Sequence, residues 1–153
     1  MAYTRTSATT HLSNEFAALA SETGQLTTDS TGGFGPAIDR ALRTLGVTEA
    51  NLATATVADS SVPAFLALCE YHALARIWRS LATRADVSAR NVMGPRAQVF
   101  QHVKDLVTEA ANTCASYGYP VGTPVAGGAG SGGSWQTGSL TLDIIEPLDV
   151  SAP

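Results

Sequence analysis

Charged residues are scarce in this chain. Of its 153 residues, 14% are Asp, Glu, Lys or Arg, against a usual share of about 25%, while 44% are hydrophobic. A chain with so few charges either has a large core or covers part of its surface with other chains. The composition is therefore a mild indication of assembly.

Cysteine and long apolar runs are also rare. Cys69 and Cys114 both lie in helical apolar patterns, where cysteine behaves as a small buried hydrophobe, so we expect two thiols and no disulfide. The first 20 residues lack the continuous apolar core of a targeting signal, and no run approaches the roughly 18 residues needed to span a bilayer. We expect a protein made in the cytoplasm, with no membrane partner.

Positive charge is missing from the C-terminal third. Residues 76–104 contain six basic residues and one acidic residue, whereas residues 105–153 contain five acidic residues and no basic one. The basic stretch is too small for a typical nucleic-acid footprint. It could complement an acidic arm from a neighbour, but a solvated polar face that includes Arg76, Arg79 and Arg84 is the preferred interpretation.

Three segments show the apolar spacing and the Pro and Gly boundaries of helices. A short helix is expected from Pro36 to just before Gly46, a long one over residues 61–87, and a third from Pro95 to a C-terminal Gly118. Residues 1–12 are expected to be a loose arm, followed by a short helix that starts at Ser13.

The long segment is apolar on more than one side. Its main stripe at helical spacing consists of Val62, Phe65, Leu66, Cys69, Ala73, Ile77 and Leu81. Leu68, Leu74 and Trp78 lie outside that stripe. Such a helix is either central to its domain or part of a subunit interface.

The C-terminal part has a different pattern. Residues 119–134 are rich in Gly, Pro and Ser, which is typical of a flexible linker. Beyond it, Leu140, Leu142 and Ile144 alternate with polar residues in a strand pattern that ends at Pro147. A lone strand cannot pair its own backbone groups, so we expect another chain to accept it, with contacts from Trp135 and Ile145 as well.

These patterns predict a mainly α protein, a small bundle of three to four helices with a C-terminal extended arm that contains one β-strand. The expected organisation is an N-terminal arm and short helix (1–33), a helical bundle domain (34–118), a linker (119–134) and a strand arm (135–153). We find no internal repeat.

Catalytic and cofactor motifs are weak. Gly128, Gly130 and Gly133 have the spacing of a dinucleotide-binding loop, but they follow a Pro-containing loop and precede a strand, so the match is compositional chance. Cys69 and His72 are two potential metal ligands, and two ligands do not make a site. We expect no enzyme, no cofactor and no metal; an undetected enzyme would need a pocket that gathers His72 or His102 with acidic partners.

The helical segments "ALRTLGV", "YHALARIWRSLATRADVS" and "PRAQVFQHVKDLVTEA" occur in an order that resembles small head–tail connector (adaptor, or head-completion) proteins of long-tailed bacteriophages. The resemblance covers about residues 34–118. It implies a ring, typically of twelve subunits, that docks under the portal protein, extends the channel for double-stranded DNA without reading its sequence, and binds a neck or tail-completion protein. It also implies assembly in the host cytoplasm and a place in the virion.

The resemblance leaves open which residues line such a channel. A different interpretation is a small helical regulatory module that binds a peptide or DNA. That module would form no large ring, and its affinity for DNA would fall steeply with salt.

Overall fold

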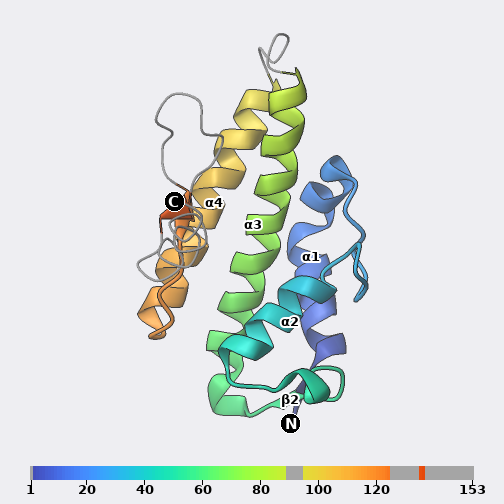
Figure 1. Ribbon diagram of the computed structural model, residues 1–153, viewed down its shortest axis with the longest axis vertical. Helices are drawn as coiled ribbons and strands as arrows, with labels where there is room; N and C mark the ends of the chain where they lie inside the picture. Colours follow the sequence, from blue (N-terminus) through green and yellow to red (C-terminus); the bar gives the residue numbers. More distant parts are fainter. Residues whose placement is uncertain (1, 89–94, 125–134, 137–153) are drawn as a thin grey trace, which may run out of the picture.

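The computed structural model describes residues 2–88, 95–124 and 135–136. The fold is mainly helical, as predicted, with α1 (Arg5–Thr23), α2 (Gly35–Thr44), α3 (Val62–Ser88) and α4 (Pro95–Ser116). Two short 3₁₀ turns, Glu49–Asn51 and Asp59–Ser61, lie between α2 and α3. In Figure 1, α3 runs through the middle of the molecule, with α1 and α2 on one side and α4 on the other.

Helix α3 is the centre of the core. Leu68, Leu74 and Trp78, which lie outside its main apolar stripe, are at most 3% exposed. Its neighbours are α1, α2 and α4, and the Trp78 ring lies 5.4 Å from the ring of Phe100 on α4. Among the described side chains, residues on both apolar sides of α3 are therefore buried inside the chain, which confirms the central position of this helix.

The boundaries of α2 and α4 agree with the Pro and Gly signals. Pro36 lies in the first turn of α2, and Gly46, two residues after its end, has a φ of 89°. Gly118, two residues beyond α4, has a φ of 86°. Only glycine adopts this left-handed conformation without strain, so these residues end the helices where the sequence predicts.

The N-terminal expectation was wrong. Residues 5–12 are helical, and α1 begins at Arg5, because the Thr4 side chain accepts a hydrogen bond from the Ser7 amide at 3.3 Å. The hydroxyls of Thr9 and Thr10 donate to carbonyl groups four residues earlier, which satisfies them within the helix. Ser13 instead donates to the Thr27 carbonyl from within α1.

The residues before α1 are also held in place. Strand β1 (Tyr3–Thr4) pairs antiparallel with β2 (Thr56–Val57), with Tyr3 opposite Val57. The Tyr3 ring lies edge-on to Phe65 of α3, with the ring centroids 6.1 Å apart. A short backbone ladder and an aromatic contact thus attach the N-terminal residues to the core.

The loop between α1 and α2 is tightly folded. The Phe34 amide donates to the Thr28 carbonyl, and the Leu26 amide donates to the Gly32 carbonyl. A Cβ at Gly33 would collide with the Thr28 carbonyl oxygen. The two glycines around Phe34 let the loop close, and Phe34 itself is fully buried.

The linker was predicted to begin at residue 119, which is too early in the chain. Tyr119 and Val121 pack against the core, and β3 (Thr123–Pro124) pairs antiparallel with β4 (Trp135–Gln136). The apolar side chains within the Pro- and Gly-containing stretch explain the difference, since they have a core face to cover. The domain therefore extends beyond Gly118, to at least Pro124.

Candidate interaction surface

The structure describes the predicted contact residues only in part. The backbone of Trp135 lies opposite Pro124 in the β3–β4 pair, so the chain returns to its own domain at this point. The predicted strand, with Leu140, Leu142, Ile144 and Ile145, lies outside the described residues. The donation of this strand to another chain stays a prediction.

The segment after α4 is attached to α3 by a buried tyrosine. The Tyr71 hydroxyl donates a hydrogen bond of 2.7 Å to the Gly122 carbonyl, and the Tyr71 residue is 5% exposed. Burial raises the pKa of Tyr71 to about 12, so the hydroxyl keeps its proton and remains a donor at neutral pH. The segment between α4 and β3 is therefore fixed beside α3.

Three arginines lie near the junction of α2 and α3, one on α2 and two on α3. Arg76 donates to the carbonyls of Thr31 (2.6 Å) and Gly33 (3.1 Å), in the loop that leads into α2. Arg79 is one turn further along α3, and Arg40 is exposed on α2. We call Arg40, Arg76 and Arg79 the arginine face. Within the described residues, neither Arg40 nor Arg76 forms an ion pair with a carboxylate.

Two arginines of this face, Arg40 and Arg79, lie close enough to His72 for their charges to act on it. The His72 ring packs edge-on against Tyr71, 5.0 Å between centroids, and its Nε2 has no hydrogen-bond partner among the described residues. Burial, followed by the charges of Arg40 and Arg79, lowers the pKa of His72 to about 4. Burial and the charge of Arg40 also lower the pKa of Arg79. The imidazole is therefore neutral beside a concentration of positive charge.

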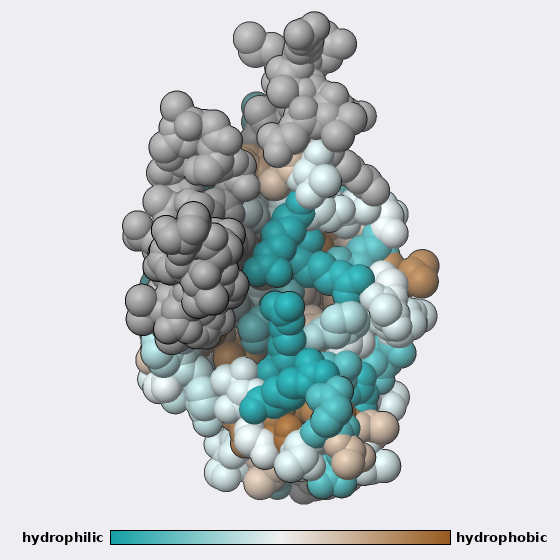
Figure 2. Space-filling view, viewed as in Figure 1, coloured by the Kyte–Doolittle hydropathy of each residue, from teal (hydrophilic) through white to brown (hydrophobic). Residues whose placement is uncertain are grey.

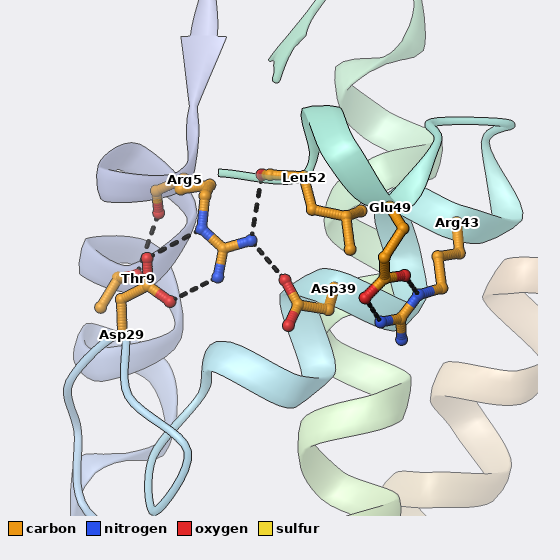
Figure 3. Close-up of polar contacts among 7 residues, drawn as sticks. All are labelled: Arg5, Thr9, Asp29, Asp39, Arg43, Glu49 and Leu52. Carbon is orange, nitrogen blue, oxygen red and sulfur yellow. Dashed lines mark hydrogen bonds and ion pairs between the residues drawn. The ribbon is translucent and has the colours of Figure 1, made fainter. Parts of the chain in front are cut away.

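The other two arginines with described side chains are neutralised (Figure 3). Arg5 donates to both carboxylate oxygens of Asp29, at 2.6 and 2.9 Å, and also to Asp39 and the Leu52 carbonyl. The hydrogen bond to Asp29 is the main reason that the pKa of Arg5 is raised. Arg43 forms a bidentate pair with Glu49, with both distances 2.7 Å.

The surface over α2 and α3 is hydrophilic. In Figure 2, hydrophilic side chains form a continuous band over the region of α2 and the middle of α3. Among the described residues, the exposed large hydrophobics are Leu26 (57%), in the α1–α2 loop, and Tyr117 (48%), directly after α4. Much of the remaining exposed surface is made of Thr, Ser, Asn and Ala, so on this part of the chain low charge does not produce a broad apolar surface.

The cysteines and histidines, which could act as metal ligands or nucleophiles, lie in the core, in a contact between helices or on the surface. Cys69 and Cys114 are free thiols, fully buried, and burial raises the pKa of each. His11 Nε2 lies 2.6 Å from Glu70 Oε1, which joins α1 to α3. His102 is exposed on α4, where Asp105 accepts a hydrogen bond from Gln101 instead. The described part of the chain has no group of three or more His, Cys, Asp or Glu that could hold a metal ion.

Sequence reasoning singled out Arg76, Arg79 and Arg84 but not Arg40. The structure joins the first two with Arg40, while the Arg84 side chain lies outside the description. Within the described residues, no helix is both long and apolar enough to cross a membrane. No protein-family model, curated protein or solved structure matches the chain.

Proposed function

We propose that this protein is a structural adaptor of the head–tail connector type in a tailed bacteriophage. Several copies form a ring under the portal protein, and the ring extends the DNA channel and provides a docking surface for a neck or tail-completion protein. The protein has no catalytic role in this proposal, and its place is the virion, at the junction of head and tail.

The helical order of residues 34–118 carries the proposal. A short helix, a long helix and a third helix resemble the connector pattern, and the corresponding elements are α2, α3 and α4, with α3 at the centre. The acidic C-terminal residues that follow supply an arm that can reach a sister subunit or the portal. Arms that add a strand to another chain gain affinity from main-chain hydrogen bonds.

The buried apolar residues of α3, such as Leu68, Leu74 and Trp78, are covered inside the chain, so the ring contact has to use other surfaces. A closed ring with head-to-tail contacts needs two different patches on each subunit. Leu26, in the α1–α2 loop, and Tyr117, directly after α4, are exposed apolar side chains in separate parts of the chain. We infer that each contributes to one of the two patches.

Light scattering of the purified full-length chain over a range of concentrations tests the proposal. We expect a single closed assembly of many subunits at high concentration, and a Leu26→Ser variant should shift it toward monomers. Thr10→Ser, on an exposed position of α1, is the matched control and should assemble like the unaltered chain. A monomer at every concentration would contradict a self-assembling ring.

A truncated chain then tests the arm. It should end at Gln136 rather than at Gly118, because Tyr119 and Val121 belong to the core and β4 pairs with β3. Loss of the assembly in this form would assign the subunit contact to the arm. An intact assembly would leave the arm for a different partner, such as the portal.

A further inference from the structure

We propose that the arginine face binds the acidic C-terminal segment of the same chain, residues 137–153. The first support concerns Arg40 and Arg76, which have no carboxylate partner among the described residues. Asp29 and Asp39 are bound to Arg5, and Glu49 is bound to Arg43. Arg40 and Arg76 form no ion pair within the described residues. The hydrogen bonds that Arg76 donates go to neutral carbonyl groups.

The second support is charge complementarity. Residues 137–153 contain Asp143, Glu146 and Asp149 and no basic residue. Guanidinium groups bind carboxylates through paired hydrogen bonds, and these are stronger than contacts between neutral groups. Three carboxylates spaced three residues apart can therefore match several guanidinium groups that lie around one helix pair.

The third support is the path of the chain. Gly122, just before β3, accepts the hydrogen bond from Tyr71, and the charges of Arg79 and Arg40 both act on the Tyr71 hydroxyl. Because β4 pairs with β3, the acidic segment follows directly after a strand that is attached to the domain. From Gln136 to Asp143 an extended chain spans at most about 25 Å.

This short tether favours the chain's own segment over that of another copy. A segment joined to its site by only a few residues has an effective concentration in the millimolar range, far above that of free protein in a dilute sample. The contact does not require a ring, so it stands or falls independently of the proposed function. Side-chain ion pairs also leave the backbone groups of residues 139–146 available to another chain.

Paramagnetic relaxation in the full-length protein tests the contact. A Ser151→Cys variant accepts a nitroxide label selectively, because Cys69 and Cys114 are fully buried. We expect the label to broaden the amide signals around Arg40 and Arg79 at low salt. In 1 M salt the Debye length falls to about 3 Å, so the broadening should decrease strongly.

Charge reversal identifies the partners. Arg40→Glu combined with Arg79→Glu should reduce the broadening by about fivefold or more, since each exposed pair contributes up to about a fivefold change in population. Adding Asp143→Arg and Glu146→Arg to the same chain should restore it. Arg43→Glu is the matched control on α2: Arg43 is paired with Glu49, so its reversal should leave the broadening in place.

Two results would overturn the proposal. One is equal broadening in the unaltered chain and in the Arg40→Glu, Arg79→Glu variant. The other comes from a mixture of labelled protein without ¹⁵N and unlabelled ¹⁵N protein: broadening of similar size there would show that the segment binds a second copy. An assembly seen by light scattering changes neither outcome when the mixture is kept dilute.

Discussion

At the scale of single residues, two arginine–carboxylate contacts of similar chemistry have different surroundings. The Arg5 side chain is 15% exposed and reaches four acceptor atoms on three segments of the chain. The Arg43 and Glu49 side chains are 46% and 75% exposed. Exposed ion pairs contribute little to stability because water and salt screen them, whereas hydrogen bonds to partly buried charges contribute more.

We therefore expect Arg5→Ala to lower the free energy of unfolding by about 1–3 kcal/mol, because Asp29 and Asp39 lose their partner. Urea denaturation measures the difference. Arg43→Ala is the control and should leave the midpoint almost unchanged. Equal midpoints for the two variants would show that Arg5 does not hold the N-terminal helix to α2.

His72 makes stability depend on pH. Its pKa is about 4 in the folded chain and 6.5 when unperturbed, so the unfolded chain binds a proton that the folded chain does not. The stabilisation is present in full above pH 6.5 and is lost as the pH falls toward 4. Between these two pH values, the free energy of unfolding falls with a slope that approaches about 1.4 kcal/mol per pH unit.

A His72→Gln variant removes this titration. Its unfolding free energy between pH 7 and pH 4 should fall less steeply than that of the unaltered chain, whatever the offset between the two curves. Urea denaturation at four pH values provides the comparison. Parallel curves would mean that His72 titrates normally in the folded protein.

At the scale of elements, the start of α1 depends on a single capping residue. Thr4 accepts the Ser7 amide hydrogen bond and, at the same time, belongs to strand β1. Capping satisfies amide groups that the first turn of a helix leaves without partners. The position of α1 over the core therefore depends on Thr4 as well as on buried Ala8 and Leu12.

Thr4→Ala should lower the free energy of unfolding by about 1 kcal/mol through loss of the cap. Thr6→Ala, an exposed position in the same turn, is the matched control and should have no destabilising effect, since Ala is the better helix former. Thermal unfolding distinguishes the two. A cap at Ser13, as the sequence suggests, would make Thr4→Ala neutral.

At the scale of the whole molecule, α3 is the element that the other helices share. It contacts α1, α2 and α4, and its buried residues include Phe65, Leu68 and Ile77, each at most 1% exposed. Amides in such a central helix exchange only when most of the domain opens. Peripheral helices can open locally.

Native-state hydrogen exchange should therefore be slowest in residues 68–78 of α3, with a free energy close to that of global unfolding. Exchange in α1 should be faster, because α1 lies at the outside of the bundle, whereas α3 lies at its centre (Figure 1). Mass spectrometry of peptic fragments provides the comparison. Slower exchange in α1 than in α3 would contradict the central role of α3.

The sequence by itself determined α2, α3 and α4. Their apolar side chains recur at helical spacing, and Pro36, Pro95, Gly46 and Gly118 restrict the backbone locally, so these boundaries need no tertiary information. The apolar residues of α3 on several sides indicated either a central helix or a subunit interface, and the burial of Leu68, Leu74 and Trp78 confirms the central position.

Only the tertiary structure decided the rest. The first half of α1 has no apolar stripe, and it is helical because Thr4 caps it and the core covers Ala8 and Leu12. Tyr71 and Gly122 are 51 positions apart, and Arg40 and Arg79 lie on two different helices, α2 and α3, so no local pattern relates them. Packing of α2 and the residues after α4 against α3 brings these groups together, and a charge or hydrogen bond acts across space irrespective of separation along the chain.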